Sequence, residues 1–210
     1  MGFSIIWDID GTLFDTYPAF VGAFVLALHG AGVSAPPPAP EVDALARVGL
    51  AHCANELASR FGLDAGALSD RFAELYGDVP LARQRPYLGA REICEAILRQ
   101  GGLNAIATHR GRGSTERLLS EHGMGHLFGD IASVEEGFPK KPSPAMFMSL
   151  MERRGLVASR CVAVGDRDID VLAGRAAGIR TCLYRGEPAR SSPDFAFREY
   201  GELLRYLGLS

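Results

Sequence analysis

Short, continuous apolar runs alternate with helical patterns along most of this chain, and no other feature constrains its fold as strongly. Residues 3–8 are typical of a strand buried on both faces, and residues 103–108 of a second buried strand. Further strands are predicted at 160–166 and 180–184, with a short one near 130–133. Helical patterns lie between or after them, at residues 90–100, 114–122, 144–154, 168–177 and 199–207. Strands that alternate with helices predict an α/β fold with a doubly wound parallel sheet and right-handed crossovers.

The segment between the first two runs breaks this alternation because it is helical throughout. Helical patterns occupy residues 18–29, 41–60 and 66–76, and "SAPPPAP" at 34–40 is typical of a stiff loop between two helices. An all-helical insertion that leaves a sheet directly after its first strand predicts a separate domain. We therefore expect a core domain formed by residues 1–15 and 87–210, and a helical domain at residues 16–86.

Composition narrows the classes of partner and location. The chain has 210 residues, a net charge of −3 and no basic block, which argues against nucleic acid as a partner. The longest apolar stretch, residues 19–28, is too short to span a membrane, and Asp8 and Asp10 interrupt the first run, so we expect no signal peptide. None of the four cysteines forms a CxxC pair; we expect Cys161 and Cys182 to be small buried hydrophobes in a cytoplasmic protein.

Polar clusters follow the apolar runs, where strands of a parallel sheet would end. They are Asp8 with Asp10, Thr108 to Arg110, Lys140 with Lys141, and Asp166 with Asp170. Ligands of doubly wound sheets bind beyond the carboxyl ends of the strands, so we expect these clusters to converge. Carboxylates crowded at the mouth of a buried strand are costly unless a positive group lies among them. Hard oxygen ligands beside a hydroxyl and a lysine therefore indicate a Mg²⁺ site next to a phosphate site.

The same clusters carry a family resemblance. "DIDGTL", the threonine of "IATHR", "KKPSP" and "VGDRDID" resemble, in this order, the four motifs of the haloacid dehalogenase (HAD) superfamily of phosphohydrolases. The helical insertion is similar to the C1 cap of subfamily I, and the resemblance covers essentially the whole chain. It implies a Rossmann-like core with a C1 cap and a Mg²⁺-dependent phosphatase of the phosphoglycolate phosphatase type, acting on a small phosphomonoester.

The resemblance also implies roles for the acidic residues. Asp8 is expected to be the nucleophile that forms an aspartyl-phosphate, and Asp10 the general acid and then the general base. The backbone carbonyl of Asp10 and the carboxylates of Asp8 and Asp166 are expected to bind Mg²⁺. Asp170, the fourth residue of this metal site, is expected to orient a metal-bound water or Lys141.

Phosphate-binding groups follow from the same resemblance. The Thr108 hydroxyl, the His109 N–H and the N–H groups after Asp10, including that of Gly11, are expected to hold phosphoryl oxygens. Lys141 is expected to neutralise charge on the nucleophile and on the transferred group.

Other polar residues near these motifs have simpler interpretations. Asp15 is expected to cap the first helix of the insertion, Asp168 to be an N-terminal helix charge, and Lys140 to remain in solvent. Arg110 and Arg167 depart from the family pattern, because small residues are frequent at both positions, and they are placed to alter contacts at the phosphate end.

Several functional questions stay open from the sequence. A phosphosugar mutase of the β-phosphoglucomutase type uses the same first aspartate, and a non-catalytic phosphate-binding regulatory protein can have the same fold. Arg47, His52 and Asn55 are candidate specificity residues in the insertion, although an exposed helix face explains them equally well. The expected partner is a small phosphate ester, with no nucleic acid or membrane, and the protein is a monomer or a homodimer.

Overall fold

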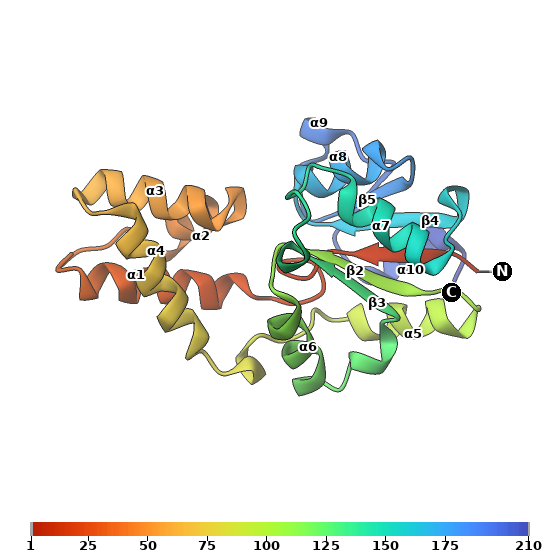
Figure 1. Ribbon diagram of the computed structural model, residues 1–210, viewed down its shortest axis with the longest axis horizontal. Helices are drawn as coiled ribbons and strands as arrows, with labels where there is room; N and C mark the ends of the chain where they lie inside the picture. The colour runs from red at the N-terminus through yellow and green to blue at the C-terminus, as the bar shows by residue number, and fades with distance from the viewer. Residues whose placement is uncertain (1, 210) are drawn as a thin grey trace. The chain divides into compact units, whose positions relative to one another are not determined.

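The structure is a computed structural model in which residues 2–209 are described. The chain forms two compact units, one made of Met1–Asp15 with Arg85–Ser210 and the other of Thr16–Gln84. Figure 1 shows a sheet with flanking helices in the first unit and only helices in the second.

Within residues 2–209, the first unit contains one six-stranded parallel sheet with the order β3-β2-β1-β4-β5-β6 (Figure 1). Its strands are β1 (Ser4–Trp7), β2 (Asn104–Thr108), β3 (Asp130–Ser133), β4 (Cys161–Gly165), β5 (Arg180–Tyr184) and β6 (Phe195–Phe197). The chain builds one half of the sheet outward from β1 and then returns to β4 for the other half. This doubly wound parallel arrangement confirms the predicted fold class. Strand β6 was not predicted, because three residues are too few to show a strand pattern.

Helices connect the strands of this unit. They are α5 (Ala90–Arg99), α6 (Arg112–Glu121), α7 (Ala145–Arg154), α8 (Asp168–Ala176), α9 (Pro188–Ser191) and α10 (Tyr200–Leu207). Single 3₁₀ turns of this unit lie at Gly125–Leu127, Val134–Glu136 and Ala158–Arg160, and another lies at Leu81–Arg83 in the second unit. The predicted helices agree with these bounds to within two residues at each end, but the four-residue α9 was missed.

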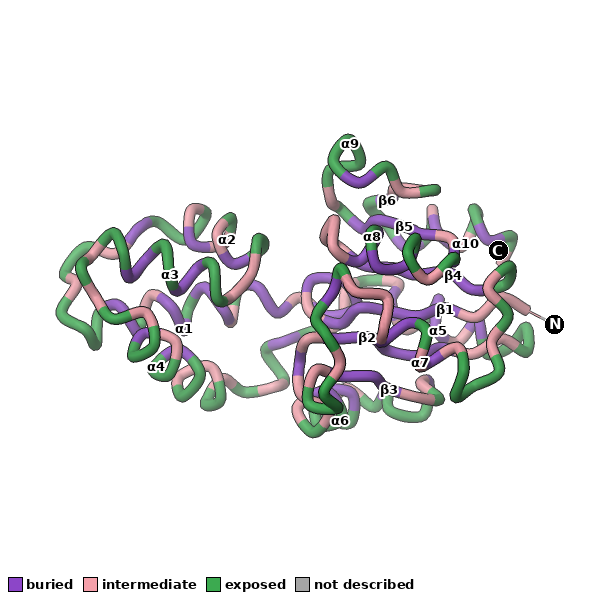
Figure 2. The backbone as a smooth tube through the Cα atoms, turned by 45° about the horizontal axis from the view of Figure 1, so that its top comes forward, coloured by how far each residue is buried: buried purple, intermediate pink, exposed green. Residues whose placement is uncertain are grey.

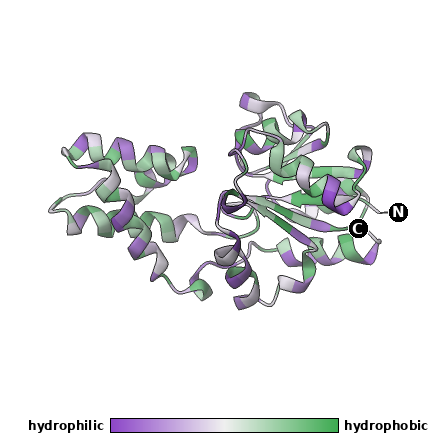
Figure 3. Ribbon diagram, in the orientation of Figure 1, coloured by the Kyte–Doolittle hydropathy of each residue, from purple (hydrophilic) through white to green (hydrophobic). Residues whose placement is uncertain are grey.

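The two faces of the sheet are buried by different helices. Ile6, Ala105 and Ala163 face α7 and α8 in one apolar cluster that includes Phe147. Trp7, on the opposite face of β1, packs against Tyr200 of α10 with ring centres 6.1 Å apart. Figures 2 and 3 show the strands as the most buried and most apolar part of this unit.

Asn104 is a buried polar residue on the second face whose side chain contacts three other elements. The Asn104 side chain accepts a hydrogen bond from Trp7 Nε1 at 2.9 Å and donates to the carbonyls of Cys94 at 2.8 Å and Leu127 at 3.2 Å. This one residue of β2 thereby joins β1, α5 and the turn that precedes β3.

The second unit consists, within the described residues, of α1 (Tyr17–Gly30), α2 (Ala39–Val48), α3 (Leu50–Phe61) and α4 (Ala65–Gly77) around its own apolar core. Phe24 and Phe72 stack in this core with ring centres 4.1 Å apart. The predicted helical stretch at 41–60 divides at Gly49, a residue whose backbone freedom makes it a poor helix former.

The prediction that Asp15 caps α1 was wrong. Thr16 is the N-cap residue, and no side-chain hydrogen bond caps this helix. Asp15 Oδ1 instead accepts a hydrogen bond from the Tyr87 hydroxyl at 3.1 Å, and its N–H donates to the Arg85 carbonyl at 2.8 Å. Asp15 thus ties together the two segments of the first unit that flank the helical unit in sequence.

The structure also shows where the cysteines lie and how long and apolar the helices are. Cys161 and Cys182 are free and buried, as predicted, and so are Cys53 and Cys94. Among residues 2–209, no helix combines the length and apolar character needed to cross a bilayer.

Candidate active site

The loop after β1 carries the candidate residues Asp8 and Asp10 and is held by hydrogen bonds between its own backbone groups. Gly11 has a φ of 82°, a conformation that favours glycine, and its N–H donates to the Phe14 carbonyl at 2.9 Å. The N–H groups of Thr12 and Phe14 both donate to the Ile9 carbonyl. The Gly11 N–H is therefore used inside the loop, which differs from its expected role as a phosphate donor, and we assign Gly11 a conformational role.

Asp8 lies at the mouth of the sheet in a buried ion-pair cluster. Lys141 Nζ is 2.6 Å from Asp8 Oδ1, 2.5 Å from Asp170 Oδ1 and 3.1 Å from the Ala107 carbonyl oxygen. The Lys141 side chain is fully buried, whereas Lys140 is exposed, as predicted. Residues that are 133 positions apart in the chain therefore meet here, and the ammonium supplies positive charge between two carboxylates.

Asp170 reaches this cluster because the backbone of β4 leaves room for it. A Cβ atom placed on Gly165 would lie 2.2 Å from Asp170 Cβ, so only glycine permits this approach of α8 to β4. Asp170 Oδ2 also accepts the Arg167 N–H at 3.1 Å. Both oxygens of Asp170 thus have protein donors, and its contact with Lys141 is one of the two roles expected for it.

The acidic residues form a group that can hold a divalent cation. Among the described residues, Asp8, Asp166 and Asp170 each offer a carboxylate oxygen within 4.8 Å of those of the other two. Thr12 Oγ1 lies 3.4 Å from Asp8 Oδ2 and 3.3 Å from Asp166 Oδ1. Three hard oxygen donors at this spacing suit Mg²⁺, and the half-buried Asp166 leaves one side open.

Two further acids lie near this group without belonging to it. Asp168 is in the first turn of α8, as predicted for a helix-terminal charge. The carboxylate of Asp10 also lies outside the group formed by Asp8, Asp166 and Asp170.

Burial and charge shift the pKa values of this cluster in opposite directions. Burial raises the pKa of Asp8 to about 6, against the lowering effect of Lys141 and with a raising effect of Asp170. Burial would also raise the pKa of Asp170, but Lys141 and Arg167 outweigh it and lower that pKa. For Lys141 burial acts downward, and the two carboxylates outweigh it and raise its pKa. Lys141 and Asp170 therefore form a stable ion pair, whereas the Asp8 carboxylate is poorly stabilised by the protein alone.

Thr108 and His109 lie where β2 ends. Thr108 is buried, and its Oγ1 accepts the Arg110 N–H at 3.0 Å, so the hydroxyl hydrogen remains able to donate. His109 Nε2 accepts the backbone N–H of Lys141 at 2.8 Å. Burial, together with Lys141 and Arg167, lowers the pKa of His109 to about 3, so the ring is neutral with its proton on Nδ1.

Arg110 forms an ion pair with Asp10 that bridges two motifs. Its Nη2 is 2.7 Å from Asp10 Oδ1, and its Nε is 3.2 Å and 3.3 Å from the two carboxylate oxygens. The Arg110 side chain is 5% exposed. Arg110 is recognisable in the sequence as a departure from the family pattern, but its partner is not, because the two residues are 100 positions apart.

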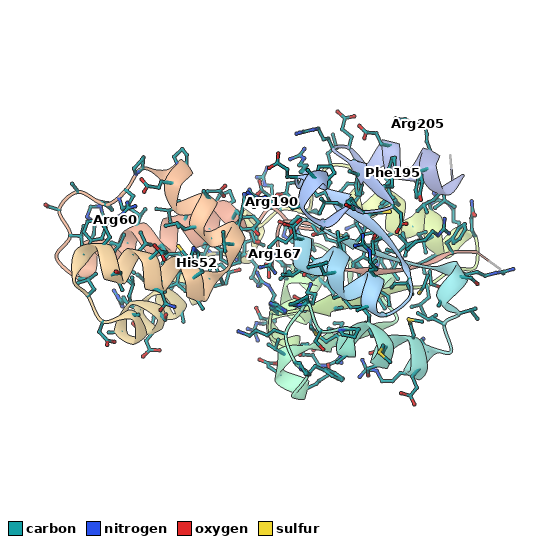
Figure 4. The ribbon with its side chains drawn as sticks, turned by 90° about the horizontal axis from the view of Figure 1, so that it is seen from above. His52, Arg60, Arg167, Arg190, Phe195 and Arg205 are labelled. Carbon is teal, nitrogen blue, oxygen red and sulfur yellow. The ribbon has the colours of Figure 1, made fainter. Side chains whose placement is uncertain are left out.

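Two arginines follow strands of the sheet, and the candidate specificity residues lie in the helical unit. Arg167 follows β4 and Arg190 lies on α9 after β5 (Figure 4). In the helical unit, His52 and Asn55 are exposed on α3. Arg47 pairs with Asp43 at 2.7 Å and lies 3.9 Å from the centre of the Tyr17 ring, contacts typical of a stabilised helix surface.

Comparison with known proteins agrees with this geometry. The sequence model of the haloacid dehalogenase-like hydrolases matches residues 5–184. The chain is 29% identical to a phosphoglycolate phosphatase of Aliivibrio fischeri over 98% of this chain and 96% of the relative. It is 24% identical to the pyrophosphatase PpaX of Halalkalibacterium halodurans over 98% of this chain and 97% of the relative.

Solved structures share the fold along the whole chain. A predicted phosphoglycolate phosphatase from Haemophilus somnus superposes with a TM-score of 0.83 at 24% identity, covering 98% of this chain and 97% of that one. A Thermotoga maritima protein described provisionally as a β-phosphoglucomutase does so with a TM-score of 0.80 at 19% identity, covering 99% of both chains. From the matched residues and the strand-end cluster together, we conclude that this chain belongs to the haloacid dehalogenase-like hydrolase family.

Proposed function

We propose that this protein is a Mg²⁺-dependent phosphatase that hydrolyses a small phosphomonoester through an aspartyl-phosphate on Asp8. One observation carries the proposal: the Asp8 carboxylate lies at the mouth of the sheet, 2.6 Å from a buried lysine, and groups with Asp166 and Asp170 within 4.8 Å. A nucleophilic carboxylate beside a cation-binding acid group suits phosphoryl transfer, where positioning and electrostatics supply most of the catalysis.

The first chemical step forms a bond between an Asp8 carboxylate oxygen and the phosphorus of the ester. The bond from phosphorus to the ester oxygen breaks, and Asp10 gives its proton to the departing alkoxide. Lys141 is held on Asp8 Oδ1 and stabilises the negative charge of the transferring group. The Thr108 hydroxyl and the N–H of His109 would hold phosphoryl oxygens at the end of β2.

The second step returns the enzyme to its starting state. Asp10, now ionised, removes a proton from a water molecule that attacks the phosphorus. The acyl-phosphate bond breaks, orthophosphate leaves, and the Asp8 carboxylate is restored. One residue thus acts as acid and then as base, and no net proton is lost from the site.

The donor set fits Mg²⁺ because it consists of hard carboxylate oxygens that are poorly compensated without a cation. Asp8, Asp166 and the backbone carbonyl of Asp10 would hold the ion, with Asp170 behind them on Lys141. When bound, the ion would neutralise phosphoryl oxygens and bring the anionic ester toward the Asp8 carboxylate.

The substrate class follows from the relatives. Several curated relatives that match this chain over nearly its full length are named phosphoglycolate phosphatases, so 2-phosphoglycolate is the first candidate. We propose that the helical unit serves as a cap domain that excludes water and large substrates. The four cysteines of the protein are buried and free of disulfides, which supports a cytoplasmic location.

A panel of phosphorylated metabolites tests this function. Purified protein is assayed for orthophosphate release with Mg²⁺, using 2-phosphoglycolate, pyrophosphate, several sugar phosphates and p-nitrophenyl phosphate. We expect Mg²⁺-dependent release that chelation abolishes and added Mg²⁺ restores. Interconversion of glucose phosphate isomers without orthophosphate release would favour the mutase, and phosphate binding without turnover of any ester would favour a non-catalytic protein. Activity that survives exhaustive chelation would contradict the metal requirement.

A further inference from the structure

We propose that Arg110 is a positioning residue that fixes the orientation of the Asp10 carboxylate, the acid–base group of the reaction. The inference rests on the proposed function, because Asp10 needs an orientation only if it transfers protons to and from a reacting group. It gives a role to Arg110, a residue that departs from the family pattern, and it follows from contacts in this chain.

The contact geometry is that of a fork, not of a single salt bridge. Arg110 Nη2 and Nε both donate to Asp10 Oδ1, at 2.7 Å and 3.2 Å, and Nε also lies 3.3 Å from Oδ2. Donors from two nitrogens of a rigid planar guanidinium constrain the plane of a carboxylate, which a lysine ammonium does not do. Asp10 is thereby held in one side-chain orientation.

Arg110 is itself held in place from two further directions. Its backbone N–H donates to Thr108 Oγ1 at 3.0 Å, and its Nη1 donates to Ser114 Oγ at 2.9 Å in the first turns of α6. With its side chain 5% exposed and that of Asp10 23% exposed, the pair is shielded much better than an ordinary surface ion pair. The brace therefore connects the end of β2 and the start of α6 to the loop after β1.

Asp10 depends on this brace because it has no place in the other acidic cluster. Its carboxylate lies outside the group formed by Asp8, Asp166 and Asp170, and Lys141 contacts Asp8 and Asp170 instead. Proton transfer from a placed group contributes about 10²- to 10⁴-fold in rate, and a displacement of about 1 Å can cost 10²-fold. Loss of Arg110 should therefore reduce the rate of the reaction through its effect on Asp10.

A double-mutant cycle tests this dependence. The variants are R110Q, R110K, D10A and D10A combined with R110Q, with R112Q as the matched control. Arg112 lies two residues further along and pairs with Glu136 at 3.1 Å, away from Asp10. Values of kcat/KM are measured with 2-phosphoglycolate, whose alkoxide needs a proton to leave, and with p-nitrophenyl phosphate, whose phenolate does not. If the panel identifies another alkyl phosphate as the substrate, that ester replaces 2-phosphoglycolate.

We expect R110Q to lower kcat/KM for the alkyl ester about tenfold or more and for p-nitrophenyl phosphate less than about threefold. In the D10A background the same substitution should change neither value by more than about twofold. R110K, which keeps the charge but loses the fork, should lie between wild type and R110Q. R112Q should leave the ratio of the two substrates unchanged.

Three results would overturn the inference. The first is an equal loss on both substrates, and the second is a loss in D10A as large as that in the parent. The third is a fold defect of R110Q as the cause, shown by an unchanged rate per active site when active sites are counted from the burst of p-nitrophenolate release. Equal or additive losses would mean that Arg110 binds the phosphate or supports the fold. If wild type releases no orthophosphate, or if D8N is as active as wild type, the proposed function fails instead, so the two failures are distinguishable.

Discussion

Asp8 is buried at a position where an isolated carboxylate would be costly, and the surrounding residues explain how the chain tolerates it. Lys141 contacts both Asp8 and Asp170, and removal of one partner from such a buried group typically costs about 3–5 kcal/mol. Asp8, Asp166, Asp170 and Lys141 could be predicted from the sequence because each lies in a short motif that resembles one of the family's motifs. The pairing of Arg110 with Asp10 could not be predicted, because that contact depends on side-chain orientation across 100 positions.

His109 provides a residue-scale prediction about pH. Its pKa lies near 6.5 in the unfolded chain and is lowered to about 3 in the fold, mainly by burial. Between these values the unfolded state binds a proton that the folded state does not, so this residue's contribution to the free energy of unfolding is present above pH 6.5 and is lost as the pH falls.

In H109Q the amide oxygen can still accept the Lys141 N–H, but the titrating group is gone. We therefore expect the free energy of unfolding of wild type to fall more steeply than that of H109Q between pH 7 and pH 4, measured by urea denaturation. All other titrating groups are present in both proteins, so their contributions to the pH dependence of the free energy of unfolding cancel when the two proteins are compared. A difference between the two proteins that stays constant over this range would show that His109 is not held neutral by the fold.

At the scale of the elements, local patterns determined most of what could be predicted. Apolar runs mark β1, β2, β4 and β5, whereas β6 has three residues and α9 has four, too few to show a periodic pattern. The division of α2 from α3 at Gly49 was also missed, because the apolar spacing on both sides of the glycine is compatible with a single helix. The positions of β6, α9 and the break between α2 and α3 depend on packing against the rest of each unit. A local sequence pattern does not contain that information.

Asn104 joins several elements and supports an element-scale prediction. It is fully buried, and its replacement by alanine leaves Trp7 Nε1 and the carbonyls of Cys94 and Leu127 without their partner. We expect N104A to lower the free energy of unfolding by roughly 3 kcal/mol or more, since each of the three buried groups left unsatisfied costs about 1–3 kcal/mol. N55A, at an exposed position of α3, should change it by about 0.5 kcal/mol or less. Equal effects of both variants in chemical denaturation would contradict the role of Asn104.

At the scale of the whole molecule, the fold brings together residues from both ends of the first unit. The doubly wound order places β1 next to β4, so Asp8 and Asp166 follow neighbouring strands although 158 positions separate them. This convergence was predicted from the rule that ligands bind beyond the carboxyl ends of such strands. We propose, in addition, that the helical unit acts as a cap domain for the site in the first unit.

Metal binding should therefore stabilise the entire fold. A ligand that binds only the native state adds roughly 2.7 kcal/mol at a hundredfold excess over its Kd, and each kcal/mol raises the melting midpoint by about 2–4 °C in a chain of this size. We expect Mg²⁺ to raise the melting midpoint of wild type by several degrees and that of D166N by much less. D168N removes a neighbouring acid outside the metal group and should respond as wild type does. The same Mg²⁺ response in D166N and wild type would exclude Asp166 as a ligand.

The most direct test of the account is the rate of orthophosphate release by Asp8→Asn at saturating Mg²⁺. Asparagine keeps the shape of the side chain but is a far weaker nucleophile, so the account predicts a loss of roughly 10³-fold or more in kcat with the fold intact. Acid-quenched wild type should carry a phosphoryl group on Asp8 that the variant lacks. A D8N variant, pure and free of wild-type enzyme, that turns over at the wild-type rate would contradict the central claim that Asp8 is the nucleophile.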